Sequence, residues 1–203
     1  MRLDLRFDAT QAILQQLAAG APADLLVLTA EALKDLNVTQ VRALGSSGVG
    51  IAVRAGAPKP DIGSVKALKR ALEAAQSVAH SKIGASGLYF VELIGRLDIK
   101  LKKRVVVDKG PVGLVVASGE AEIGVQQLCE LAPVPGIDIV GPLPEAIQKV
   151  THFSAGIAAN ATNAKGAAAL LELLLSNAAR AAMAEGGIQP ATSEPPSPRR
   201  PTS

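Results

Sequence analysis

The sequence predicts an α/β protein with mixed, mostly parallel sheets, and three observations lead to this fold class. Residues 24–29 form an almost continuous apolar run of strand length, as expected for a strand covered on both faces. Segments with strand patterns alternate with segments of helical spacing, which favours βαβ units with right-handed crossovers. Glycine and proline separate these segments, and a hydrophobic content of 48% allows a substantial core.

The first part of the chain predicts two helices and three strands. Residues 3–7 alternate apolar and charged side chains, which is the period of a half-buried strand. The strand at 24–29 lies between helical patterns at 10–19 and 30–36. Residues 45–54 predict a glycine-rich turn that leads into a strand.

A connector at residues 56–60, Gly-Ala-Pro-Lys-Pro, predicts the first boundary between two lobes. Asp61 or Ser64 can cap a helix that runs to about residue 76, because a short side-chain oxygen accepts hydrogen bonds from first-turn amides. The further elements expected in this part are strands at 77–81, 104–107, 122–126 and 137–140, and helices at 84–97, 111–118 and 127–131.

The last part of the chain predicts a return to the first lobe. Residues 150–159 have a strand pattern, and Asn163 can cap a final helix over 164–185. Residues 186–203 are rich in Pro, Ser, Thr and Arg and are expected to be disordered. The expected domains are therefore lobe 1 at 1–57 plus 151–185, lobe 2 at 58–150, and a disordered tail at 186–203.

Composition excludes several classes of function. The net charge is +3, but Arg199 and Arg200 lie in the tail, so the remainder is close to neutral. One dense basic cluster occurs, at residues 100–104, and it is interpreted as a solvated helix end or as an anion or partner site. Since a nucleic-acid binder usually shows a basic stripe with a reading motif, we expect no nucleic-acid partner. Cys129 is the single cysteine, which excludes an intramolecular disulfide. No apolar run approaches the ~20 residues of a membrane-spanning helix.

The best candidates for chemistry are glycine- and hydroxyl-rich turns where strands are expected to pass into helices. They lie at residues 8–10, 45–48, 84–87 and 109–110. Ligands of open α/β sheets bind at the carboxyl ends of strands, where helix N-termini present unpaired amides to anions. Several such turns facing one cleft would form an oxyanion or carboxylate site.

Motifs for catalysis and for cofactors are missing. Residues 45–50 lack the Lys-Ser/Thr ending of a phosphate-binding loop and do not have the spacing of a nucleophile elbow. His80 and His152 lie in no motif, and with Cys129 they give no metal-ligand spacing, so structural roles are favoured for all three. We therefore expect no enzyme, no cofactor and no metal.

Residues 7–36, FDATQAILQQLAAGAPADLLVLTAEALKDL, resemble the opening region of the molybdate-binding proteins of ABC importers. The Gly-Ala-Pro-Ala-Asp element at 20–24 is present in full, and the turn at 84–89, the helix start at 108–118 and the strand at 155–157 follow in the family's order. The resemblance implies a two-lobed periplasmic-binding-protein type II fold with a hinge cleft.

The resemblance also implies a substrate-binding protein that captures a small anion and delivers it to an ABC permease in the periplasm. The anion would be a molybdate-like oxyanion or a small organic carboxylate. The implied ligand-binding residues are Thr10, Gln11, Ser46, Ser86, Lys109, Gly110, Gln126 and Gln127.

Two departures from the family pattern stand out. Gln126 and Gln127 occupy the place of the family's tyrosine, and glutamine both donates and accepts hydrogen bonds, which permits an organic ligand. The family's secretory leader and first strand would precede residue 3. The alternative is therefore a ligand-sensing or remnant relative of the same fold, without transport function, and a cytoplasmic location stays open.

Overall fold

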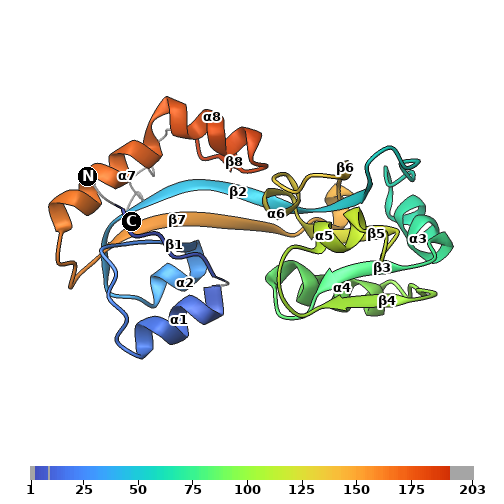
Figure 1. Ribbon diagram of the computed structural model, residues 1–203, viewed down its shortest axis with the longest axis horizontal. Coiled ribbons are helices and arrows are strands. Elements are labelled where there is room, and N and C mark those ends of the chain that lie inside the picture. The colour runs from blue at the N-terminus through green and yellow to red at the C-terminus, as the bar shows by residue number, and fades with distance from the viewer. Residues whose placement is uncertain (1–2, 9, 193–203) are drawn as a thin grey trace, which may run out of the picture.

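Two long strands join the two halves of the protein. The computed structural model describes residues 3–8 and 10–192 of the 203-residue chain. Strands β2 (Val38–Arg54) and β7 (Val150–Ala158) run antiparallel and side by side between the halves (Figure 1). β2 changes partners between Gly48, which lies opposite Val150, and Val49, which lies opposite Gln127. One strand thus serves both sheets.

Lobe 1 is built on an antiparallel sheet. β7 lies between β1 (Leu25–Thr29) and β2, and β8 (Gln189–Pro190) pairs with β2. Its helices are α1 (Thr10–Ala18), α2 (Ala30–Lys34), α7 (Ala164–Leu175) and α8 (Asn177–Glu185). Ile157 and Leu171 pack in a small core on one side, while Leu28 and Leu33 pack in another with α1.

Lobe 2 carries the larger core. Its sheet contains the end of β2, β3 (Val78–Ser81), β4 (Arg104–Val107), β5 (Ile123–Gln127) and β6 (Ile137–Pro142). Its helices are α3 (Val65–Ala74), α4 (Ala85–Arg96), α5 (Val112–Ala117), α6 (Leu128–Leu131) and the short η1 (Glu145–Ile147). Phe90, Leu68 and Leu72 are fully buried in its core.

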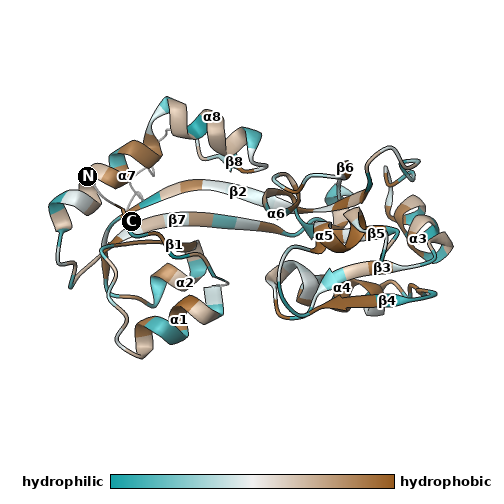
Figure 2. Cartoon of the chain, in the orientation of Figure 1, coloured by the Kyte–Doolittle hydropathy of each residue, from teal (hydrophilic) through white to brown (hydrophobic). Residues whose placement is uncertain are grey.

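The two lobes are more hydrophobic than the middle of the strands that join them. Figure 2 shows hydrophobic residues on β1, β4 and α5, whereas the middle of β2 and β7 is pale to hydrophilic. The pale part of β2 is the Gly-Ser-Ser-Gly stretch at 45–48. The hydrophobic cores therefore lie within the lobes and not along the crossing, by which we mean the β2–β7 pair that joins the lobes.

The sheets are mixed, as the sequence predicts, but the expectation that they are mostly parallel was wrong. Among the described strands, β3 pairs in parallel with β4 and β5, and all other pairs are antiparallel. The reason is the crossing: β2 leaves lobe 1 and β7 returns to it, so these two strands must run in opposite directions, and both lobes build on them.

Two local predictions fail in the first part of the chain. Residues 45–48 lie inside β2 and form no turn. The glycines of this stretch serve close packing instead of a turn: a Cβ on nearby Gly50, for example, would lie 2.3 Å from Leu128 Cδ2. Residues 3–7 form no strand and lie exposed, with Phe7 88% accessible. Alternation alone does not make a strand when no described strand pairs with it.

The last part of the chain differs from prediction at two places. The expected helix over 164–185 breaks at Ser176, whose extended backbone ends α7 and whose hydroxyl caps α8. Within the described residues no single helix is long and apolar enough to span a membrane, and only the 63° bent pair α7–α8 passes that test jointly. Residues 186–192 are ordered through β8, against the expected disorder, whereas 193–203 lie outside the described residues.

Asp24, the last residue of the Gly-Ala-Pro-Ala-Asp element, fastens β1 to the turn before α7. Its Oδ1 accepts hydrogen bonds from Asn163 N at 3.0 Å, Thr162 N at 2.7 Å and Thr162 Oγ1 at 3.1 Å. The Asn163 amide has the largest effect and lowers the pKa of this carboxyl; desolvation opposes it, and the two Thr162 groups lower the pKa further. The element thus has a structural role that its sequence did not disclose.

We expect Asp24→Asn to lower the melting temperature at pH 7, because one oxygen loses its charge while three donors still face it. A carboxyl whose pKa is lower in the folded state stabilises above its ordinary pKa of 3.8, and this contribution is lost as the pH falls through the folded value. The difference between wild type and variant, measured by thermal unfolding, should therefore shrink below about pH 4. The exposed Asp35→Asn is the control, and a constant difference down to pH 2 would contradict the expectation.

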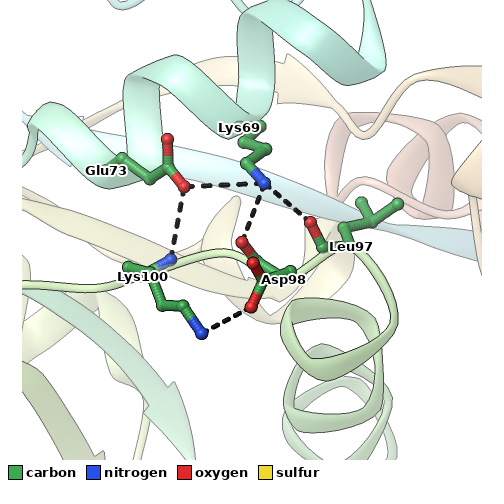
Figure 3. A network of polar contacts seen from close by, with 5 residues as sticks. All are labelled: Lys69, Glu73, Leu97, Asp98 and Lys100. Carbon is green, nitrogen blue, oxygen red and sulfur yellow. Dashed lines mark hydrogen bonds and ion pairs between the residues drawn. The ribbon is translucent and has the colours of Figure 1, made fainter.

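Lys69 ties α3 to the C-terminal end of α4. Figure 3 shows its Nζ donating to Leu97 O at 2.9 Å and Asp98 O at 2.8 Å, and pairing with Glu73 at 3.7 Å. Carbonyls at a helix end have no partners within the helix, and a cation there also complements the helix dipole. The Glu73 carboxylate in turn accepts a hydrogen bond from Lys100 N.

We expect Lys69→Met to destabilise the protein by about 1–2 kcal/mol in urea unfolding, since two charge-assisted hydrogen bonds are lost at a partly exposed site. Lys66→Met changes an exposed lysine on the same helix and should cost little. Equal effects of the two substitutions would show that the Lys69 contacts add nothing to stability.

Candidate functional site

Three helices begin at one edge of the lobe 2 sheet. β3, β4 and β5 are parallel, with Ser81 opposite Val107 and His80 opposite Val125, so all three strands end at the same edge. α4, α5 and α6 start directly beyond these strand ends. This edge has the arrangement at which open α/β sheets bind ligands.

The start of α4, which follows Gly84, lacks a side-chain cap within the described part of the chain. By contrast, α2, α3, α7 and α8 are each capped by a hydroxyl or amide side chain, from Thr29, Ser64, Asn163 and Ser176. The sequence predicted the Asn163 cap and offered Ser64 as one of two candidates, with Asp61, for the cap of α3. First-turn amides without a cap can bind an anion.

Five of the eight predicted ligand-binding residues lie at this edge. Ser86 is the second residue of α4 and is buried, at 2% exposure. Lys109 and Gly110 are exposed in the loop between β4 and α5, where Gly110 has a φ of +83°. Gln126 and Gln127 end β5. The geometry brings these residues to one edge, and their role in binding remains a proposal.

The two glutamines make protein contacts in this arrangement. Gln126 Oε1 accepts a hydrogen bond from Val112 N at 2.8 Å and so caps α5 from the neighbouring strand. Gln127 Nε2 donates to Thr151 Oγ1 at the start of β7. Both side chains are 5% exposed. Gln126 therefore shapes this edge, and Gln127 ties it to the crossing.

The other three predicted residues lie elsewhere. Thr10 and Gln11 begin α1 in lobe 1, and Figure 1 shows this end of α1 on the side of lobe 1 toward lobe 2. Ser46 lies in β2 opposite His152 and lines a pocket together with Gly187 and Gln189. None of the other seven predicted residues lines that pocket, although Leu128 at the start of α6 does.

Three polar groups near the edge are not among the predicted binding residues, and for one of them, His80, the sequence favoured a structural role. His80 Nε2 and Ser81 Oγ are buried without a hydrogen-bond partner among the described residues. His80 Nδ1 lies 2.9 Å from Ser81 O, and the ring packs against Phe90 with centroids 5.6 Å apart. Burial lowers the pKa of His80, the bond to Ser81 O opposes this shift, and the nearby Arg104 adds a smaller lowering effect.

Glu130 in α6 is the third missed group. Neighbouring protein desolvates its carboxyl and raises its pKa, although the residue keeps exposed area and a Gln126 hydrogen bond opposes the shift. Burial likewise raises the pKa of the adjacent Cys129 thiol. A carboxyl whose pKa is raised by its surroundings is a candidate for giving and taking protons. No sequence motif marks it, because its shift comes from packing.

Metal binding finds no support in the part of the chain that the structure describes. Within residues 3–8 and 10–192, no three side chains of His, Cys, Asp or Glu gather where they could hold an ion. The edge of lobe 2 instead offers amides, glutamines and a lysine, which are donors suited to anions.

Comparison with known proteins places this geometry in a family. The model of the bacterial extracellular solute-binding proteins matches residues 1–189. An aconitate isomerase of Pseudomonas sp. is 41% identical over 198 residues, covering 93% of this chain and 75% of the relative.

Two solved structures share the fold. The periplasmic molybdate-binding protein of Azotobacter vinelandii is 17% identical, with a TM-score of 0.68 over 89% of this chain and 84% of that one. The sulfate-binding protein SubI of Mycobacterium tuberculosis is 18% identical, with a TM-score of 0.64 over 91% and 75%. These likenesses confirm the expected two-lobed type II fold.

The relative also corrects one expectation. The prediction that the protein is not an enzyme is contradicted, because a protein 41% identical over almost the whole chain is an isomerase. An acid–base group that is tuned by packing has no fixed spacing in the sequence, so the absence of a catalytic motif does not exclude an enzyme. With the match over residues 1–189, the chain belongs to the bacterial extracellular solute-binding protein family.

Proposed function

We propose that the protein is an isomerase of aconitate or of a closely similar unsaturated tricarboxylate. The observation that carries this proposal is the 41% identity to an aconitate isomerase over 93% of the chain. The ligand would be enclosed between lobe 1, residues 1–57 with 151–185, and lobe 2, residues 58–150. The hinge would lie where β2 changes partners between Gly48 and Val49.

The donors at the edge of lobe 2 fit a polycarboxylate. The amides at the start of α4, near Ser86, would bind one carboxylate, and the Lys109 ammonium, exposed in the neighbouring loop, would bind a second. Thr10 and Gln11, at the end of α1 nearest lobe 2, would reach the ligand when the lobes close. A ligand that bridges both lobes stabilises the closed state.

The reaction requires a proton to be moved between two carbon atoms. A base takes a proton from the methylene carbon, and the electron pair forms a new double bond to the central carbon. The old double bond opens, and the former vinylic carbon takes up a proton. We assign this transfer to Glu130, because its raised pKa suits both halves of the step and it is more accessible than His80.

Solute capture for an ABC permease is the second candidate, and the family match favours it. In that case the protein would work in the periplasm and would release an anion, such as a carboxylate or an oxyanion, without changing it. The same donors would serve, and Glu130 would be dispensable.

Proton NMR of cis- and trans-aconitate incubated with the purified protein separates the candidates. Interconversion above the rate without protein, together with deuterium uptake in D₂O, supports the isomerase. Glu130→Gln should then reduce turnover at least about a hundredfold while aconitate binding is kept. Binding of aconitate, sulfate or molybdate in a thermal-shift assay without interconversion would overturn the isomerase and support capture. Neither binding nor turnover would overturn both.

A further inference from the structure

Residues 186–191 run from the end of α8 back along β2 and are anchored on lobe 1. Pro190 lies opposite Gly45 and Gln189 opposite Ser46, and Ala191 N donates to Leu44 O at 2.9 Å. The Arg180 guanidinium donates to Ala191 O. Gly45 permits this approach, since a Cβ there would lie 2.5 Å from Gln189 O. We call residues 186–191 the strap.

The strap also touches lobe 2, at the start of α6. Ser47 Oγ donates to Gly187 O at 3.0 Å and accepts from Cys129 N at 3.0 Å, and Ser47 is 3% exposed. Gly187 packs directly on this helix, because a Cβ there would lie 2.8 Å from Leu128 O and 3.0 Å from Cys129 N. The Ser47 hydroxyl thus links β2, the strap and lobe 2 at the point where β2 changes sheets.

The strap lies across the crossing from the helices that face each other between the lobes. Figure 1 shows α8 and β8 on one side of the β2–β7 pair, and α1, α2 and α4 on the other. A pocket of about 290 Å³ lies between strap and crossing, lined by Ser46, Ser47, Leu128, Gln148, Gly187 and Gln189 among others. A rotation that brings α1 toward α4 must therefore draw α6 away from Gly187.

We propose that the strap holds the lobes in the arrangement seen here and that Ser47 is the positioning residue through which it acts. Closure stretches or breaks the contact from Gly187 through Ser47 to Cys129, so the strap opposes closure. A protein with a weakened strap closes more readily without ligand and binds any ligand that bridges the lobes more tightly. This inference concerns the lobes alone and does not depend on which proposed function is correct.

Single-molecule FRET between α1 and α4 tests the strap. Dyes are placed at Gln15→Cys and Glu92→Cys, both exposed positions, in a Cys129→Ser background. Ser47→Ala should increase the ratio of closed to open molecules by about three- to tenfold without ligand, because two hydrogen bonds that hold the arrangement seen here are lost. A chain that ends at Glu185 should shift the ratio in the same direction.

Ser118→Ala is the matched control, since among the described residues the Ser118 hydroxyl bonds within lobe 2, to Val115 O and Glu120. It should leave the FRET distribution unchanged. Circular dichroism shows which variants are folded, and Ser47→Ala alone suffices if the shortened chain unfolds. An unchanged or more open distribution in folded Ser47→Ala would overturn the proposal. Because the FRET readout needs neither ligand nor turnover, its outcome does not depend on whether the proposed isomerase activity is correct.

Discussion

Gly87→Ala is expected to destabilise the protein by about 3 kcal/mol or more and to abolish anion binding at the start of α4. A Cβ on Gly87 would lie 1.9 Å from Ser81 O and 2.5 Å from Ser81 Oγ. The first of these atoms is backbone at the end of β3, so the strand end or the first turn of α4 must move. Urea unfolding measures the loss, and a thermal-shift assay with aconitate measures the binding.

Gly95→Ala in the same helix is the matched control. A Cβ there meets no atom within 4 Å, so the alanine should stabilise α4 by about 0.5–1 kcal/mol through its higher helix propensity. The two substitutions are chemically identical and differ only in what surrounds the methyl group. Equal stabilities of the two variants would show that the close approach of β3 and α4 does not exist in solution.

Gln126→Leu is expected to cost about 1–3 kcal/mol, because it leaves the buried Val112 amide without its acceptor. It also removes the hydrogen bond that opposes the raised pKa of Glu130, so that pKa should rise further. If the isomerase is correct, kcat/KM for aconitate should fall by about tenfold or more, and the alkaline shift of its pH profile should mark the change at Glu130.

Gln15→Leu, an exposed change on α1, is the control for general effects of losing a glutamine. Urea unfolding gives the stability of both variants, and kinetics across pH 5–9 gives the profile. A Gln126→Leu protein with wild-type stability would exclude the capping role. A loss of activity without a shift in the pH profile would show that Gln126 does not act through the pKa of Glu130.

Elements whose pattern is local were predictable from sequence. The helix caps at Ser64 and Asn163 are confirmed, since a cap depends on residues only three positions apart. The strand at 24–29 is confirmed as β1, because a continuous apolar run of that length has few alternatives. The glycine turn at 84–87 does begin α4, as predicted.

Predictions failed where the outcome depends on distant partners. Residues 45–48 have the composition of a turn, yet β7, β8 and α6 pack around them and hold them in one long strand. Residues 3–7 have a strand's alternation without a strand partner among the described residues. Residues 186–190 look disordered by composition, yet β2 supplies a partner for β8.

The sequence by itself determined the α/β class, most element positions and, through its resemblance, the two-lobed fold, because these follow from local patterns and their order. Only the tertiary structure gathered Ser86, Lys109 and Gln126 at one edge and showed that the strap meets α6 through Ser47. It also decided that the pKa of Glu130 is raised and that of His80 is lowered, since a pKa depends on burial and on neighbours that can be far away in the sequence. The expectation that the protein is not an enzyme was wrong for the same reason, since a linear sequence does not record the packing that tunes an acid–base group.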